Sequence, residues 1–357
     1  MITTVTLSCG SNPNEPTSPT ISVSSVSPNS GPTIGGTPIT VTGANFAAGA
    51  TLTIGGANAL NVTVVDATTI SATTAPRLGG PADVTVSSGG RGATLPGGFT
   101  YMDVQNQAPT ISAVRAQGTK YQNQPSRYAD LDEDIEVSVD VSDNETPIPQ
   151  LRFEWSSSPS GGTFSGEGRV IRWRAPRDVD RTPVAYTLTA TVIEQYQTVD
   201  TGGSVVTREH RTTGTVVVQV HNSSKEVNDL AGQFMADFSN SSVPPEAVVR
   251  NFSDNCAGKS GELTDIKENR STRTITSSII GVPTVRINFG GTCAFRSRPG
   301  DACVTMSCQW TSTIKATGKI ETTKGTCYLT AVHEAPRWLL CDSEFDGTTS
   351  TNLRFQF

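Results

Sequence analysis

Glycine and proline residues divide the N-terminal part of this chain into short alternating segments, and this punctuation constrains the fold more than any other feature. In residues 21–46, Val23, Val26, Ile39 and Val41 alternate with serine and threonine, which is the period of a strand with one buried face. The intervening SPNSGPTIGG supplies turn residues and positions that accept positive φ. The pattern predicts two strands joined by a wide turn at the start of a β-sandwich.

Further motifs follow in order as far as residue 102. TIGG, DATTISATTAP, VTV and GGFTY come after SPNSGPTIGGTPITVTGANF, with glycine pairs at 55–56 and 79–80. Over residues 19–102 this series resembles the IPT/TIG family, which has an immunoglobulin-like fold. The resemblance implies a spacer or a binding sandwich on a bacterial surface or secreted protein.

The chain of 357 residues is too long for one ordinary core, and its shifts in composition predict three domains. Its 33 glycines, 21 prolines and 35% hydrophobic residues favour short strands. The predicted fold class is mainly β, with two immunoglobulin-like β-sandwiches followed by an α+β (NTF2-like) disulfide-containing domain. A net charge of −6 without a Lys/Arg-rich run disfavours nucleic acid as a partner. No apolar run approaches the roughly 18 residues of a membrane helix.

Six of the seven cysteines lie near the C-terminus, without any CxxC pair, and the chain has only three histidines. This makes a zinc site a poor interpretation and favours disulfides formed in an oxidising compartment. The six disulfide candidates are Cys256, Cys293, Cys303, Cys308, Cys327 and Cys341. Their connectivity stays open. One hypothesis is that Cys327 and Cys341, which flank the turn near Glu334, bridge adjacent strands.

The seventh cysteine, Cys9, stands in a polar, proline-rich tether at residues 1–18. The GSNPNEPTSPT that follows it is similar to the start of a bacterial lipoprotein after its lipidated cysteine, which implies a lipid anchor to the outer membrane or cell surface. Two features depart from that pattern. Leu7 stands two positions before the cysteine instead of three, and residues 1–8 are too short for a complete signal peptide. A free thiol in a disordered tail is the alternative.

Residues 108–222 form the second predicted domain, which follows the linker DVQNQAPT. Ile135, Val137, Val139 and Val141 alternate with polar residues, and LRFEWSSSP, RVIRWRAP, VAYTLTATVIE and GTVVVQV are further predicted strands. The order of these segments resembles PKD-like and cadherin-like sandwich domains of bacterial surface proteins. Trp155 is predicted to lie in the core of this sandwich.

Acidic residues at the mouth of one strand are a candidate metal site. Asp130, Asp132 and Asp134 supply the hard oxygen ligands that suit Ca²⁺, and the cadherin-like resemblance implies the same ion. Solvated carboxylates are the alternative. No cofactor is expected for the chain, and calcium is the one candidate.

The long connection at residues 194–213 is a second candidate site, because loops of this length are often functional. It carries Tyr196, Arg208, His210 and Arg211, which could form a small recognition surface. An extended hairpin that protects a sheet edge or contacts a neighbouring domain is the alternative.

A third domain, residues 223–357, begins where the pattern becomes helical. Ser223 and Glu226 are placed as a capping box, and the apolar residues after them have helical spacing. Pro245 fits the first position of a second helix. Strands with hairpin turns at RPGD and EAPR fill the remainder. The prediction is two helices packed on a curved antiparallel sheet.

The final segment, CYLTAVHEAPRWLLCDSEF, resembles the end of NTF2-like and SnoaL-like domains. The resemblance implies a cone that can hold a small apolar molecule, and enzymes of this kind place an acid or a base inside it. The candidates here are Asp265, Glu321, Tyr328, His333 and Asp342. No nucleophile elbow, metal triad or phosphate loop occurs in the sequence, so catalysis is the minority interpretation.

These patterns predict a non-catalytic bacterial cell-surface or secreted protein for binding, adhesion or assembly, with the C-terminal domain as recognition head. The expected partner is another surface protein, a glycan or further copies of the chain. Three alternatives stay open: a structural subunit of an extracellular filament or surface layer, a glycan-binding protein, and an NTF2-like enzyme. Glycan binding normally uses exposed aromatic pairs, whereas only 6% of the residues are aromatic.

Overall fold

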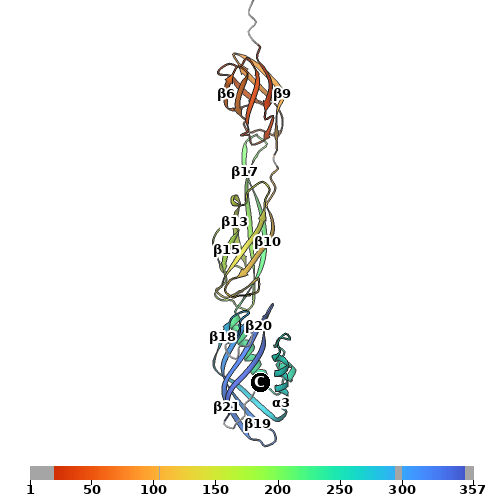
Figure 1. Cartoon of the computed structure of the whole chain (residues 1–357), viewed down its shortest axis with the longest axis vertical. Coiled ribbons are helices and arrows are strands. Elements are labelled where there is room, and N and C mark those ends of the chain that lie inside the picture. Colours follow the sequence, from red (N-terminus) through yellow and green to blue (C-terminus); the bar gives the residue numbers. More distant parts are fainter. Residues whose placement is uncertain (1–19, 104, 294–299, 350–357) are drawn as a thin grey trace, which may run out of the picture. The chain divides into compact units, whose positions relative to one another are not determined.

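The structure is a computed structural model that describes residues 20–103, 105–293 and 300–349. Most of these residues lie in strands, which confirms the predicted mainly β fold class (Figure 1). The chain divides into two compact units. The first comprises Met1–Ala108, Asn144–Pro147 and Glu194–His210, and the second comprises Pro109–Asp143, Ile148–Ile193 and Arg211–Phe357.

The first unit contains a sandwich of two sheets around one hydrophobic core. One sheet has the order β1 (Ser22–Ser27), β3 (Pro38–Ala44), β7 (Thr69–Thr73), β6 (Leu60–Asp66), and the other β2 (Ser30–Pro32), β9 (Arg91–Met102), β8 (Gly80–Ser88), β4 (Thr51–Ile54), β5 (Ala57–Asn58). β1 pairs antiparallel with β3, as the alternation in residues 21–46 predicts. Val41, Ile70, Val84 and Phe99 are completely buried in the core.

The second unit opens with another pair of sheets. One has the order β10 (Thr110–Gly118), β12 (Asp134–Ser142), β15 (Val170–Arg174), β14 (Thr163–Ser165), and the other β11 (Tyr128–Asp130), β17 (Val205–His221), β16 (Val184–Val199), β13 (Arg152–Ser158). A 3-10 helix, Ile148–Gln150, precedes β13. Trp173 is the fully buried tryptophan here. Trp155 is partly buried against the core, and its indole N–H donates to the carbonyl oxygen of Gly168 at 3.1 Å.

The segment predicted as a long connection is an extended hairpin formed by β16 and β17, which is the form given by the alternative interpretation. Only residues 200–204 lie outside the two strands. Asp200 closes this turn, since its carboxylate accepts the backbone N–H groups of Gly202 and Ser204, each at 2.9 Å. Such local side-chain bonds are the reason that aspartate favours turns.

Three helices begin the C-terminal part of the second unit: α1 (Ser223–Ser239), α2 (Pro245–Val248) and α3 (Gly258–Thr272). The predicted capping box is wrong. Asn222 caps α1, because its side-chain oxygen accepts the N–H of Lys225 at 3.0 Å. α2 begins at Pro245 as predicted but covers a single turn. α3 was not expected, and the described residues include no helix with both the length and the apolar character needed to cross a membrane.

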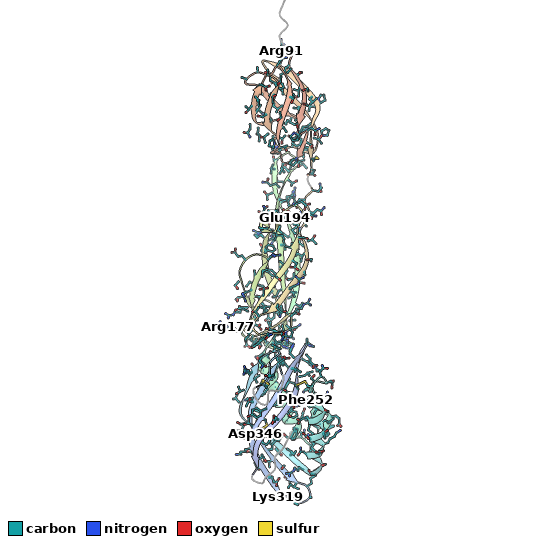
Figure 2. All side chains as sticks on the ribbon, in the orientation of Figure 1. Arg91, Arg177, Glu194, Phe252, Lys319 and Asp346 are labelled. Carbon is teal, nitrogen blue, oxygen red and sulfur yellow. A yellow bond between two sulfur atoms is a disulfide. The ribbon has the colours of Figure 1, made fainter. Side chains whose placement is uncertain are left out.

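A four-stranded antiparallel sheet follows the helices, in the order β18 (Arg273–Ile287), β19 (Ala302–Ile314), β20 (Ile320–Glu334), β21 (Arg337–Thr349). The predicted turn at EAPR joins β20 to β21 with Glu334 opposite Arg337. The predicted turn at RPGD lies partly outside the described residues. Side chains of α1, α2 and α3 share one hydrophobic core with the sheet, and Phe252 lies within it (Figure 2). These elements confirm an α+β arrangement, and the NTF2-like resemblance stays a prediction.

Candidate functional site

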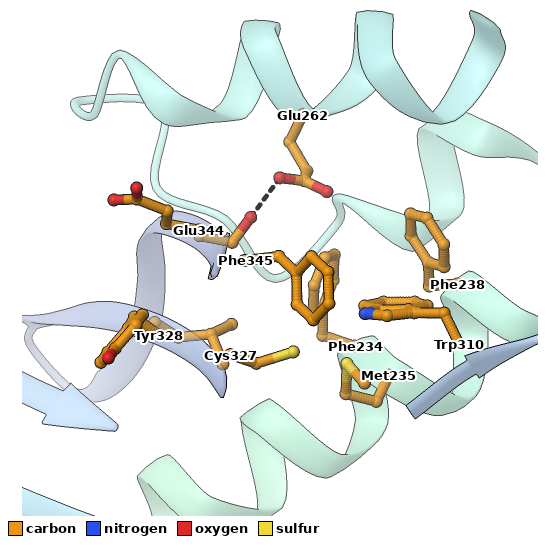
Figure 3. A pocket seen from close by; sticks show the side chains of 11 residues that line it. Phe234, Met235, Phe238, Glu262, Trp310, Cys327, Tyr328, Glu344 and Phe345 are labelled. Atoms are coloured by element: carbon orange, nitrogen blue, oxygen red, sulfur yellow. Dashed lines mark hydrogen bonds between the residues drawn. The ribbon is translucent and has the colours of Figure 1, made fainter. Parts of the chain in front are cut away.

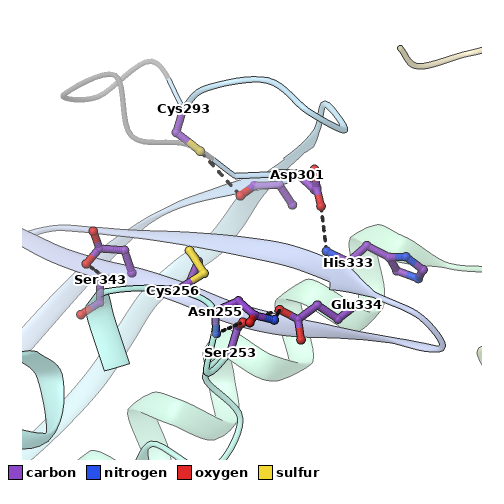
Figure 4. The surroundings of a disulfide bond; sticks show 11 residues. Ser253, Asn255, Cys256, Cys293, Asp301, His333, Glu334 and Ser343 are labelled. Atoms are coloured by element: carbon purple, nitrogen blue, oxygen red, sulfur yellow. Dashed lines mark hydrogen bonds between the residues drawn. A yellow bond between two sulfur atoms is a disulfide. The ribbon is translucent and has the colours of Figure 1, made fainter. Parts of the chain in front are cut away.

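Three disulfides hold the C-terminal part together. Cys256 joins Cys341, Cys293 joins Cys303, and Cys308 joins Cys327, with Cα–Cα distances of 5.2, 5.5 and 6.0 Å. These distances are normal for disulfides. All six predicted cysteines are therefore paired. Figure 4 shows Cys256 beside the short segment of Ser253 and Asn255 that leads into α3.

The hypothesis of a Cys327–Cys341 bridge is wrong because of the register of the last hairpin. Glu334 pairs with Arg337 at the turn, and the same register places Cys327 opposite Phe345. Cys341 lies closer to the turn, at an irregularity between the partners of Thr330 and Ala331. Cys327 instead meets Cys308 on the neighbouring strand β19.

The interior between α1, α3 and the sheet is almost filled. Phe234, Phe238, Trp310 and Phe345 project into it, and Figure 3 shows their rings gathered around the remaining space. That cavity offers about 20 Å³ to the centres of water molecules, which is room for about one water. The open cone implied by the NTF2-like resemblance is not present in the described residues.

Glu262 is the one α3 side chain that brings a charge to this cavity. It is 5% exposed, and the Ser343 hydroxyl donates a hydrogen bond to its carboxylate. Burial raises the pKa of Glu262 to about 7, and the nearby charge of Asp265 raises it further. The hydrogen bond from Ser343 lowers the pKa but does not offset the effect of burial. Glu262 is therefore close to half protonated at neutral pH. Sequence reasoning missed it because α3 was not predicted.

The acid and base candidates named from the sequence do not gather around the cavity. Of the five, Tyr328 lines it. Hydrogen bonds from Arg273 at 2.7 Å and Lys319 at 3.0 Å lower the pKa of Glu321 to about 2. Asp265 lies part-buried on α3, where burial raises its pKa.

Asp342 lies on β21, where its carboxylate accepts the backbone N–H of Ser343. The fifth candidate, His333, packs at a junction of β11, β17 and the C-terminal sheet. Its ring centroid lies 4.8 Å from that of Tyr128, 5.1 Å from His221 and 5.2 Å from Trp338. Neither ring nitrogen has a hydrogen-bond partner among the described residues. Burial, assisted by His221, lowers the pKa of His333 to about 4.

The same junction ties the end of β17 to the start of α1. His221, 1% exposed, places Nδ1 3.0 Å from both carboxylate oxygens of Glu226. Tyr128 and Ser223 share a hydrogen bond between their hydroxyls. Tyr128 belongs to β11 yet packs in the core of the helices and the C-terminal sheet, so the second sandwich and the C-terminal part are continuous.

The three aspartates predicted as calcium ligands do not share one site, because Asp130 is engaged apart from Asp132 and Asp134. Asp130 is buried and accepts the backbone N–H groups of Ser223 at 3.1 Å and Leu131 at 3.0 Å. Asp132 and Asp134 lie beside Arg174, at 3.4 and 3.6 Å. In the described ranges, no group of three or more His, Cys, Asp or Glu residues is arranged to hold a metal ion.

Of the four recognition candidates, the structure brings two together. The rings of Tyr196 and His210 stack with centroids 4.6 Å apart. Arg211 instead pairs with Glu154 at 2.6 Å, and Arg208 is exposed on β17. Sequence reasoning missed the buried Glu194 on the same hairpin, labelled in Figure 2, which accepts a hydrogen bond from Asn106 at 2.7 Å.

A surface groove lies on the C-terminal part, apart from the internal cavity. It offers about 410 Å³ to the centres of water molecules, within the range of small-ligand sites. Ten residues line it: Thr182, Pro183, Glu226, Asp229, Leu230, Gln233, Asn251, Arg337, Trp338 and Leu339. They come from the loop before β16, one face of α1, the segment after α2 and the start of β21.

Comparison with known families identifies the first sandwich. Residues 21–101 match the model of the IPT/TIG domain family. This confirms the resemblance drawn from the sequence motifs, and this part of the chain is an IPT/TIG domain. No curated protein matches the chain.

The chain has low-scoring similarity to several solved structures. The plexin A4 extracellular region is 13% identical, with a TM-score of 0.22 over 55% of this chain and 21% of that one. SGBP-B from a complex xyloglucan utilization locus in Bacteroides uniformis is 14% identical, with a TM-score of 0.20 over 84% and 68%. The titin fragment I67–I69 is 9% identical, with a TM-score of 0.23 over 82% and 91%. The chain thus spans about a fifth of the plexin chain, and scores this low say nothing about a shared function.

Proposed function

We propose that this chain is a non-catalytic modular binding protein of an extracytoplasmic compartment, on the bacterial cell surface or secreted, with the C-terminal part as its recognition head. The observation that carries the proposal is the set of three disulfides. Disulfides persist in oxidising compartments and are rare in the cytosol. An IPT/TIG domain at residues 21–101 is in keeping with that location.

Binding is favoured over catalysis by the contents of the C-terminal interior. Aromatic side chains fill the space in which an NTF2-like enzyme would hold its substrate, and the remaining 20 Å³ admits about one water. The surface groove is larger than this cavity and is open to solvent. A lipid anchor at Cys9 belongs to this proposal, although Cys9 lies outside the described residues.

The location is tested on protein recovered from its native cells with thiols blocked at lysis. A non-reducing peptide map should link Cys256 to Cys341, Cys293 to Cys303 and Cys308 to Cys327, in the surface or secreted fraction. Recovery of all six thiols in reduced form from the cytosol would refute the proposed compartment. Mass analysis of the N-terminal peptide tests the anchor, because an unmodified Cys9 in the membrane fraction contradicts it.

A further inference from the structure

The walls of the surface groove are fixed in place by internal hydrogen bonds. Thr182, in the loop before β16, bonds through its hydroxyl to Glu226 and accepts the backbone N–H of Asn222 at 2.7 Å. Glu226 in turn lies 3.0 Å from His221 through both carboxylate oxygens. The loop and α1 are therefore held together before any ligand arrives, and preorganisation of this kind lowers the cost of binding.

These bonds also determine which polar groups are left to face a ligand. Glu226 is occupied by His221 and Thr182, and its side chain is 13% exposed. Asp229, one helical turn further along α1, has a side chain that is 57% exposed and pairs only at the surface with Lys225. Exposed Arg337 lines the same groove. The two exposed charged groups of the lining, Asp229 and Arg337, are opposite in sign, whereas the second carboxylate, Glu226, is engaged within the wall. The exposed part of the lining therefore gives no strong preference for an ionic ligand.

The remaining chemistry suits adjacent hydroxyl groups. Asp229, Asn251 and Arg337 each end in a planar group with at least two hydrogen-bonding atoms, and Gln233, whose amide N–H donates to Asp237 at 2.8 Å, keeps its amide oxygen as an acceptor. Such groups bond two neighbouring hydroxyls at once, with carboxylate and amide oxygens as acceptors and amide and guanidinium N–H groups as donors. Leu230 and Pro183 add a small apolar surface, which matches the C–H face of a sugar ring.

We propose that this groove binds a short neutral oligosaccharide. The inference rests on the proposed binding function and names its ligand class. Trp338 lines the groove but is 2% exposed, and its ring stacks on Phe289 with centroids 5.3 Å apart. No indole face is therefore presented to a sugar at this residue. Because hydrogen bonds to hydroxyls exchange with water at little net gain, dissociation constants in the upper micromolar to millimolar range are expected.

Isothermal titration calorimetry of the full oxidised chain tests the proposal with four probes: cellohexaose, xylohexaose, mannohexaose and maltohexaose. At least one should bind. D229A should weaken that binding about tenfold or more, the effect of losing a charge-assisted hydrogen bond. D254A is a matched control, because Asp254 also forms a surface ion pair with a lysine, Lys259, yet does not line the groove. It should leave the affinity unchanged.

Three outcomes overturn the proposal: no heat with any probe, equal affinities for D229A and D254A, or binding of charged peptides in place of all four sugars. Unchanged circular dichroism and thermal midpoints must show that both variants are folded. These outcomes are independent of the native disulfide map and of the cell fraction in which the protein is found, which are the tests of the proposed function. If the disulfide map fails, the proposed extracytoplasmic compartment is refuted, whatever the calorimeter shows.

Discussion

Replacement of Glu262 by glutamine isolates a single buried carboxyl group, and the structure predicts how its contribution varies with pH. Glu262 is buried against the aromatic cavity, and its pKa is raised from 4.5 to about 7. In the unfolded chain the group loses its proton near pH 4.5, whereas in the folded protein it keeps the proton until about pH 7. The unfolded state therefore binds fewer protons between these values, and the wild type loses stability as pH rises through this range.

The rise in pKa corresponds to about 3 kcal/mol, at about 1.4 kcal/mol for each pH unit. Glutamine has nearly the same shape, keeps an oxygen that can accept the Ser343 hydroxyl, and does not titrate. E262Q and the wild type should therefore have similar free energies of unfolding at about pH 5. At about pH 8 the variant should be more stable by about 3 kcal/mol.

The assay is guanidinium unfolding of the full chain at several pH values, followed by tryptophan fluorescence. The transition of the C-terminal part is identified as the one that shifts when the disulfides are reduced. E268Q serves as the control, because Glu268 is exposed on the same helix. The difference in unfolding free energy between E268Q and the wild type should not change with pH. If the difference in unfolding free energy between E262Q and the wild type is also independent of pH, the assignment of Glu262 as a buried, proton-binding group is refuted.

Three further predictions concern the C-terminal part and its junction with the second sandwich. Because the pKa of His333 is lowered to about 4, the wild type should lose stability as pH falls from 6.5 to 4. In guanidinium unfolding at acid pH, H333F should lose less stability than the wild type over the same range. Replacing both Cys256 and Cys341 by alanine opens a loop of 85 residues and should cost about 4 to 5 kcal/mol, measured by denaturation beside the wild type. N222A removes the cap of α1 and should lower the unfolding free energy by about 1 kcal/mol; an unchanged midpoint would contradict the cap.

The strands could be predicted from the sequence because alternation of apolar and polar residues with a period of two is typical of strands and of few other structures. Val26, Ile39 and Val41 are buried as their spacing requires, and the turn motifs around them identify the IPT/TIG domain. Helix α3 was not accessible for the opposite reason. Its sequence, GKSGELTDIKENRST, buries only Glu262 and Ile266, so there is no apolar stripe from which to infer a helix.

The functional geometry was harder to predict than the elements. Disulfide pairing depends on strand register. An irregularity between Thr330 and Ala331 shifts the register of the last strand, and no local sequence motif predicts this shift. The groove combines side chains from segments as distant as Thr182 and Leu339. Such a site exists only after the sandwich, α1 and β21 are packed, so residue type and spacing could not have revealed it.

Asn222 links the stability of the C-terminal part to the shape of the groove. β17 ends at His221 and α1 begins at Ser223, so Asn222 is the whole connection between the second sandwich and the helix. Its side chain caps α1 through Lys225, while its backbone N–H donates to Thr182 in the groove wall. A one-residue connection with both groups engaged leaves little freedom for the helix to turn on the sandwich. The C-terminal part and the second sandwich should therefore present the groove as one preformed surface.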